Sequence, residues 1–322
     1  MKKVLVTGIT GQDGIFLTNI LLQKHKEIEI IGVSRNAKNN KSFFKNLNKV
    51  NNQIHNLESI SLVDLNLLDL NDTSNFIQQI NPDYVVNLSG PSSVYKSFND
   101  PLIPKSISTI FNNLTTALIE NNQFPNFYQA SSSEIFKESE KKLNEQSEFD
   151  PKSPYAVAKF KNHNKVFELR EKYDWNIISG IMFNHESEFR KNDYLIMQII
   201  QSAIKIKNNK QDILTLGSTS YIRDWSYSED IANAIYQIVI NGVSGSYVIG
   251  SGVGHKIADI LDIVFNFLDL DWKKFVNIDE SLLRTGDPVK IISDPHRIIN
   301  DLSWKSEVSF EEMVMKCLTS KL

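Results

Sequence analysis

The chain has 322 residues, 41% of them hydrophobic and 23% charged, which is the composition of a globular protein with a large core or two unequal domains. Its 35 Lys and Arg residues against 38 Asp and Glu leave a net charge of −3, which excludes a polybasic surface for nucleic acid or an anionic membrane. The single cysteine, Cys317, excludes an intrachain disulfide framework and a cysteine metal cluster, and we expect no metal site.

No apolar run approaches the roughly 20 residues of a membrane span. The apolar run of the N-terminal stretch "MKKVLVTG" ends at Gly8, too early for the hydrophobic segment of a signal peptide. We therefore expect a cytoplasmic protein with no membrane partner and no nucleic-acid partner.

Strands and helices are predicted to alternate over the first 183 residues. Strands are expected at 2–8, 28–35, 59–65, 83–89, 126–132 and 176–183, and helices at 14–25, 73–80, 107–122 and 154–173. Residues 36–56 are expected to form a loop with a broken helix. The alternation predicts an α/β fold, a Rossmann-type doubly wound parallel sheet that binds its ligand beyond the carboxyl ends of the strands.

The alternation loosens after Phe183. Helices at 228–241 and 256–268 and a half-exposed segment at 246–254 predict a smaller mixed α/β domain at the carboxyl edge of the sheet. We expect residues 1–183 to form the dinucleotide-binding domain and residues 184–322 most of the substrate domain. A strand and helix from about 213–250 can return to the first domain.

The stretch "VTGITGQDG" has three glycines in G-x-x-G-x-x-G spacing between the first strand and the first helix. Such a turn lets a pyrophosphate approach the backbone amides at a helix N-terminus. It predicts dinucleotide binding, and the alternative is a glycine turn kept only for packing. The residues concerned are Gly8, Ile9, Thr10, Gly11, Gln12, Asp13 and Gly14.

The end of the second strand indicates which dinucleotide binds. An NAD site usually has a carboxylate there, whereas a 2'-phosphate favours arginine. The sequence has Arg35 and no carboxylate, so we expect NADP rather than NAD; an ordinary surface arginine is the alternative. Asp69 and Leu70, past the third strand, are expected to contact the adenine or to form a simple turn.

The stretch "SPYAVAKF" places Tyr155 and Lys159 four residues apart on the predicted helix 154–173, on one face and about 6 Å apart. An ammonium beside a phenol lowers the phenol pKa and favours proton transfer. Ser132 and Glu134 follow the strand 126–132 at the edge where the ligand is expected. These four residues are the predicted catalytic groups.

These motifs resemble the extended short-chain dehydrogenase/reductases, and among them the GDP-mannose 4,6-dehydratases. The resemblance covers nearly the whole chain and rests on "TGITGQDG", "FYQASSSEIF", "SPYAVAK", "FNHES", "RDW" and "WKSEVSFEEMV". It implies that Tyr155 takes the proton of the sugar 4-hydroxyl while carbon 4 gives its hydride to NADP. Glu134 would take the proton of carbon 5 and protonate the leaving 6-hydroxyl, and the hydride would return to carbon 6.

The resemblance also implies binding residues. The cofactor would be held by Leu88, Ser89, Ser92, Tyr155, Lys159, His185 and Arg190, and the nucleotide sugar by Ser92, Ser132, Glu134, Tyr155, Asn184, Arg223 and Arg284. For Arg223 the alternative is an internal ion pair with the adjacent Asp224. The family resemblance further implies a homodimer through the helices near 106–122 and 155–173, with a tetramer as the alternative.

The chain departs from the family pattern in four places. "RNAKNNKSFF" stands in place of a serine-rich loop, and "EFRKNDYLIMQ" in place of a basic stretch. Ile103 stands where the family has a tyrosine. "RTGDP" replaces an "RPAEV"-like segment and resembles the corresponding segment of sugar-nucleotide epimerases. The alternatives are therefore a 4-epimerase, a 4-ketoreductase or a uronate decarboxylase, and, from another class, a non-catalytic NADP-binding sensor. The nucleotide and the sugar, hexose or heptose, stay open at this point.

Overall fold

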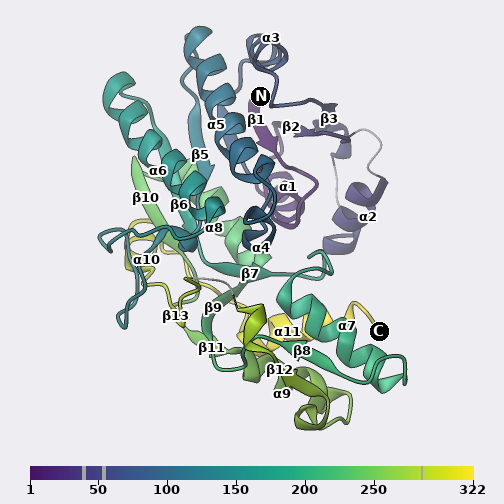
Figure 1. Ribbon diagram of the computed structural model, residues 1–322. Helices are drawn as coiled ribbons and strands as arrows, with labels where there is room; N and C mark the ends of the chain where they lie inside the picture. Colours follow the sequence, from purple (N-terminus) through teal and green to yellow (C-terminus); the bar gives the residue numbers. More distant parts are fainter. Residues whose placement is uncertain (38–40, 53–55, 284–285) are drawn as a thin grey trace.

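The computed structural model describes residues 1–37, 41–52, 56–283 and 286–322 (Figure 1). Its centre is a seven-stranded sheet in the order β10-β6-β5-β4-β1-β2-β3, and every neighbouring pair is parallel. The strands are β1 (Lys2–Thr7), β2 (Ile28–Ser34), β3 (Ile60–Asp64), β4 (Tyr84–Asn87), β5 (Asn126–Ala130), β6 (Ile177–Met182) and β10 (Gly245–Ile249). The expected α/β fold with a Rossmann-type sheet is confirmed.

Helices cover both faces of this sheet, as a buried parallel sheet requires. One face carries α3 (Leu70–Ile80), α5 (Leu102–Glu120) and α6 (Pro154–Tyr173), whose side chains share a core with Val85 and Phe127. The other face carries α1 (Gln12–Lys24) and α8 (Ser228–Asn241), which contact each other. Figure 1 shows α5 and α6 side by side along the sheet.

Strand β10 corrects one expectation. The segment 246–254 was expected to be half-exposed, but Tyr247, Val248 and Ile249 are fully buried because β10 pairs with β6 at the edge of the large sheet. Tyr247 and Ile249 join the core under α8, and Val248 joins a second cluster with Phe136 and Phe183. The sequence pattern does not predict this burial, because the side chains that cover the two faces of β10 come from distant parts of the chain.

Most of the remaining elements lie beyond the carboxyl edge of the large sheet. The small sheet contains β11 (Gly254–Lys256), β9 (Ile222–Tyr227) and β13 (Lys290–Ile291), and β7 (Asn184–Glu186) also pairs with β9. A separate pair joins β8 (Leu214–Leu216) and β12 (Val276–Ile278). The helices here are α7 (Leu195–Lys207), α9 (Ile257–Phe267) and α11 (Phe310–Thr319), whereas α10 (His296–Leu302) packs against β10 and α8 of the large sheet. The division into domains at residue 183 stays a prediction.

Two short helices complete the chain near the carboxyl edge. They are α2 (Lys41–Val50), within the segment expected to be a broken helix, and α4 (Val94–Ser97). In the described ranges no helix is both long enough and apolar enough to cross a bilayer.

Candidate active site

The glycine-rich turn joins β1 to α1 at the carboxyl edge of the sheet. Gly8 has φ +73°, and a Cβ there would lie 2.9 Å from the carbonyl carbon of Leu88. A Cβ on Gly14 would lie 2.4 Å from the carbonyl oxygen of Ile9. Only glycine fits these two positions. Helix α1 starts at Gln12 after Gly11, which makes no side-chain cap, so its first turn directs backbone amides toward this edge.

The turn is tied to β7, which lies far along the chain. Gln12 Nε2 donates to the carbonyl oxygen of His185 at 3.1 Å, and Ser187 Oγ donates to Gln12 Oε1 at 2.9 Å. His185 Nε2 lies 3.2 Å from Asp13 Oδ2, and its Nδ1 lies 2.8 Å from the carbonyl oxygen of Phe183. The structure thus brings together the cofactor residues predicted at Gln12, Asp13 and His185.

The four predicted catalytic residues come together at the ends of β5 and α6. Ser153 Oγ accepts a hydrogen bond from Ala156 N at 3.0 Å and caps α6, which begins at Pro154. This cap fixes Tyr155 in the first turn, where its side chain is buried and hydrogen-bonded to Ser132. Lys159 Nζ lies 5.7 Å from the centre of the Tyr155 ring, one helical turn away.

Glu134 lies in the short helical turn η2 (Ser133–Ile135) and is half-buried. Ser132 Oγ accepts a hydrogen bond from Glu134 N at 3.3 Å and so orients this turn. Glu134 lines a cavity of about 320 Å³. Its lining also includes the charged Lys152 and Asp287 and the apolar Phe98 and Phe136, so the carboxylate lies beside a hollow of mixed character.

Arg223 is buried in β9, but its partner is not the one that the sequence suggests. Its Nη2 lies 2.9 Å from Asp287 Oδ1, 64 residues away. Asp224 instead accepts hydrogen bonds from the backbone amides of Ser251, Gly252 and Ser293. The alternative of an Arg223–Asp224 pair is wrong because neighbouring residues on a strand point to opposite faces. Asn184 lies in β7; the predicted Arg284 lies outside the described residues.

The remaining predicted residues lie along the same edge of the sheet. Leu88, Ser89 and Ser92 follow β4, and the hydroxyl of Ser92 lies 2.6 Å from that of Tyr194. Arg190 pairs with Glu186 at 3.1 Å. Arg35 is exposed just after β2. The side chain of Asp69 accepts a hydrogen bond from Asp72 N at 2.9 Å and caps α3, which begins at Leu70. These contacts agree with the alternative of a simple turn.

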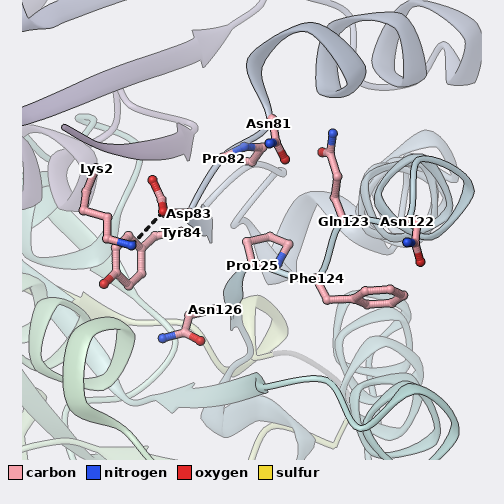
Figure 2. A pocket seen from close by; sticks show the side chains of 10 residues that line it. All are labelled: Lys2, Asn81, Pro82, Asp83, Tyr84, Asn122, Gln123, Phe124, Pro125 and Asn126. Atoms are coloured by element: carbon pink, nitrogen blue, oxygen red, sulfur yellow. Dashed lines mark hydrogen bonds and ion pairs between the residues drawn. The ribbon is translucent and has the colours of Figure 1, made fainter.

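A second hollow, of about 410 Å³, lies at the opposite edge of the sheet, where β1, β4 and β5 begin (Figure 2). Its lining includes Lys2 and Asp83, which form an ion pair at 2.8 Å (Figure 2). None of the predicted catalytic residues lines it. The predicted catalytic residues all lie at the other, carboxyl edge of the sheet.

The sequence profile of the family described as GDP-mannose 4,6 dehydratase matches residues 5–317, nearly the whole chain. The chain belongs to the GDP-mannose 4,6-dehydratase family. It is 32% identical over 321 residues to "GDP-mannose 4,6 dehydratase 2" of Arabidopsis thaliana, covering 97% of this chain and 85% of that protein. It is 29% identical over 362 residues to "GDP-mannose 4,6-dehydratase" of Vibrio cholerae, covering 100% and 94%.

Solved structures of other nucleotide-sugar enzymes share the fold of this GDP-mannose 4,6-dehydratase family member. The dTDP-glucose 4,6-dehydratase of Bacillus anthracis superimposes with a TM-score of 0.83 at 16% identity, over 100% of this chain and 96% of that one. The UDP-glucose 4-epimerase of Thermotoga maritima gives 0.82 at 20% identity, over 99% and 97%. At these identities the likeness concerns the fold alone.

The electrostatics of Tyr155 and Lys159, the predicted catalytic pair, differ from the expectation. Burial raises the pKa of Tyr155, the hydrogen bond from Ser132 opposes this, and the carboxylate of Glu134 adds to it. Burial also lowers the pKa of Lys159 to about 8, with Asp13 opposing. Burial thus disfavours both charged forms, and the pKa of the phenol lies above its ordinary value rather than below it.

A set of charged residues lies beside this pair. Burial works to raise the pKa of Asp13, but His185, Arg190 and Lys159 outweigh it and the pKa lies below the ordinary value. Burial tends to lower the pKa of His185, yet Asp13 raises it overall. Burial raises the pKa of Glu186, and Arg190 opposes this. The family member thus holds a paired histidine and aspartate, His185 and Asp13, against its glycine-rich turn.

Two residues of the site were not singled out in the sequence. Ser97 in α4 accepts a hydrogen bond from Tyr155 N at 3.2 Å, and Tyr194 contacts Ser92. Their partners are 58 and 102 residues away, so no local pattern reveals them. For Tyr194 the one signal was its place in "EFRKNDYLIMQ", where the chain leaves the family pattern.

Proposed function

We propose that the protein is a nucleotide-sugar 4,6-dehydratase that converts GDP-mannose or a related GDP-sugar to the 4-keto-6-deoxy sugar, with NADP as its cofactor. The observation that carries this is the cluster of Ser132, Glu134, Tyr155 and Lys159 beside the glycine-rich turn. The phenol is hydrogen-bonded to Ser132, and Glu134 is close enough to raise its pKa. Membership of the GDP-mannose 4,6-dehydratase family supports the substrate and the reaction.

The residues around the glycine-rich turn fit a nicotinamide dinucleotide. Gly8 and Gly14 leave a cradle that a Cβ would fill, and the amide end of α1 suits a pyrophosphate. The chain has no carboxylate at the end of β2, and exposed Arg35 suits a 2'-phosphate, which favours NADP over NAD. Leu88, Ser89, Ser92, His185 and Arg190 would complete the site. A nicotinamide held by these residues would take up the hydride of carbon 4 and supply it again to carbon 6.

The chain's own residues would handle the protons. Tyr155 takes the proton of the sugar 4-hydroxyl, and Ser132 holds the same oxygen through its hydroxyl. Lys159, which donates to the carbonyl oxygen of Ala130 at 2.9 Å, stays one turn below the phenol and orients the nicotinamide ribose. Oxidation at carbon 4 acidifies carbon 5, where Glu134 takes the proton. Glu134 then gives this proton to the departing 6-hydroxyl, and water leaves. When the hydride returns to carbon 6, carbon 5 takes up one proton, which balances the proton that Tyr155 removed from the 4-hydroxyl.

The diphosphate would be bound by arginine. Arg223 is buried and held by Asp287, so its guanidinium is oriented before the ligand arrives. Asn184 and Arg284 would contact the rest of the sugar nucleotide. We include in this proposal residues 1–183 as the dinucleotide-binding part and 184–322 as most of the sugar-nucleotide part.

We also propose a cytoplasmic homodimer, with a tetramer as the alternative assembly. Large apolar side chains are exposed on the adjacent helices α5 and α6, among them Leu102 at 67%, Phe167 at 38% and Val157 at 37% exposure. A second copy of the same helix pair would cover them in a symmetric four-helix contact. Size-exclusion chromatography with light scattering tests this, and a monomeric mass at micromolar concentration would contradict it.

The test of the reaction is mass spectrometry of the purified protein with GDP-mannose and a catalytic amount of NADP, with E134Q in parallel. The expected result is loss of one water from the sugar nucleotide without accumulation of NADPH, abolished in the variant. An unchanged GDP-mannose pool would contradict this substrate, and a panel of other hexose and heptose nucleotides would then identify it.

A 4-epimerase is the second candidate, because the Arg223–Asp287 pair joins "RDW" to the epimerase-like "RTGDP" segment. Its product has the mass of the substrate, so the same experiment with an added proton NMR spectrum separates the two reactions. Bound NADP without turnover of any sugar nucleotide would support the sensor.

A further inference from the structure

One segment of the chain crosses over the carboxyl edge of the large sheet. It leaves β6 at Phe183 and reaches the glycine-rich turn through the contacts of His185 and Ser187 with Gln12. Between β6 and β1 the sheet contains β5 and β4. The segment therefore passes above the ends of these two strands, where a dinucleotide on the turn must extend to reach Tyr155.

The far end of this crossing is tied to the loop that follows β4. The hydroxyl of Tyr194 lies 2.6 Å from the hydroxyl of Ser92. Asp193 Oδ2 lies 2.5 Å from Lys96 Nζ. Ser97, next to Lys96, accepts the hydrogen bond from Tyr155 N. The two contacts thus join the crossing to the loop that supports the catalytic tyrosine.

These contacts complete a closed ring. The loop after β4 is anchored to β1, where Leu88 N donates to the carbonyl oxygen of Thr7 at 3.1 Å. Within the crossing, the guanidinium of Arg190 lies 3.6 Å from the centre of the Tyr194 ring and 3.1 Å from Glu186. The ring thus runs from β1 and the glycine-rich turn through the crossing to the loop after β4 and back to β1.

The links of this ring differ in strength. The contacts at Gln12 and His185 are buried or half-buried, whereas both side chains of the Lys96–Asp193 pair are exposed, at 58% and 42%, and the Tyr194–Ser92 contact is also exposed. Exposed hydrogen bonds and ion pairs are the weaker kind. The ring is therefore expected to open at Tyr194 and Asp193.

We propose that Tyr194 and Asp193 form a clasp on Ser92 and Lys96 that retains the dinucleotide between turnovers. The proposal rests on the proposed function, because it needs a dinucleotide on the glycine-rich turn. Retention suits such a reaction: the cofactor ends each turnover in the state in which it began, so nothing requires it to leave. Tyr194 and Asp193 are positioning residues in this arrangement.

The test is the rate at which bound NADPH leaves the protein. The protein is loaded with NADPH and mixed with excess NADP, and the loss of NADPH fluorescence is followed by stopped flow. Y194F keeps the aromatic side chain in contact with Arg190 and removes only its hydroxyl, while K96M removes the ion pair with Asp193. Each is expected to speed release by about two- to fivefold, and the double variant by more than either single change.

Matched controls lie at other places in the chain. Y236F removes a hydroxyl that contacts His25 at 3.0 Å, and K2M removes the exposed ion pair with Asp83. Both are expected to release NADPH at the wild-type rate. The exchanged pair K96D/D193K is expected to restore most of the retention lost in K96M, which a purely structural role for Lys96 does not predict. High salt is expected to speed release from the wild type more than from K96M.

The outcomes separate the clasp from the function on which it rests. If the wild type binds NADPH and the double variant releases it at the wild-type rate, the clasp is wrong and the proposed cofactor stands. If the wild type binds neither NADPH nor NADH, the proposed cofactor is wrong and the clasp is overturned with it.

Discussion

The ammonium of Lys159 lies 5.7 Å from the centre of the Tyr155 ring and donates to the carbonyl oxygen of Ala130 at 2.9 Å. Burial lowers the pKa of this ammonium to about 8 and raises the pKa of the phenol. Burial of the pair therefore has a cost in folding stability, which is consistent with the proposed role in proton transfer.

Replacing Lys159 by methionine is expected to abolish dehydration while raising thermal stability at neutral pH. Methionine fills much of the same space without a buried charge. A pKa lowered from 10.5 to about 8 corresponds to about 3 kcal/mol, an upper bound on the gain. Turnover and the melting temperature of both proteins measure the two effects.

The gain from K159M is also expected to depend on pH. The folded pKa of Lys159 lies below the unfolded one, so between pH 8 and 10.5 the unfolded chain binds the extra proton and the wild type becomes relatively more stable as pH rises. The advantage of K159M should therefore be full below pH 8 and shrink above it. An advantage that grows with pH would contradict the assigned pKa.

Replacing Ser132 by alanine is expected to move the rising limb of the pH–rate profile to higher pH. The hydrogen bond from Ser132 lowers the pKa of Tyr155, whereas burial and Glu134 raise it. Loss of this hydrogen bond is therefore expected to raise the pKa of the phenol further. A loss of about tenfold in kcat at pH 7 is expected, smaller at alkaline pH. Turnover measured from pH 6 to 10 checks this.

Ser133 provides the control. It is buried next to Ser132, but it is not among the groups that shift the pKa of Tyr155. S133A is expected to keep the wild-type pH dependence. Superimposable profiles for S132A and the wild type would mean that Ser132 does not act on the phenol.

How much of this site the sequence predicts depends on the range of the contacts. The glycine-rich turn, the cap of α6 and the Tyr155–Lys159 stack are local, since each is set by residues within one or two helical turns. The burial of β10 and the partner of Arg223 depend on segments more than 60 residues away. The pKa of Tyr155 follows from the burial that all these segments produce together, which residue spacing does not reveal.

Replacing Asp287 by alanine is expected to destabilise the protein by about 3 kcal/mol and to raise KM for the sugar nucleotide more than it lowers kcat. The change leaves the buried guanidinium of Arg223 without the carboxylate that lies 2.9 Å away. Urea unfolding and initial rates measure the two effects.

The matched variant is D224N, which changes the carboxylate adjacent to Arg223 but not its partner. Asp224 accepts hydrogen bonds from several backbone amides, so D224N is expected to destabilise the protein. Its effect on KM is expected to be smaller than that of D287A. Equal effects on KM from both variants would show that Asp287 does not orient Arg223.

Replacing Gly14 by alanine is expected to weaken NADP binding at least tenfold. The added Cβ would lie 2.4 Å from the carbonyl oxygen of Ile9, so the turn and the start of α1 must move apart. In G11A the added Cβ would lie 3.3 Å from the carbonyl oxygen of Gly8, a contact that a small shift relieves.

The two alanine variants separate packing from ligand approach. G14A is expected to lose both melting temperature and affinity, because the helix no longer packs closely on the turn. G11A is expected to keep most of its melting temperature but to bind NADP more weakly, because its methyl group lies on the path of the pyrophosphate. Calorimetric titration with NADP and thermal unfolding check both; unchanged affinity in G11A would place the pyrophosphate elsewhere.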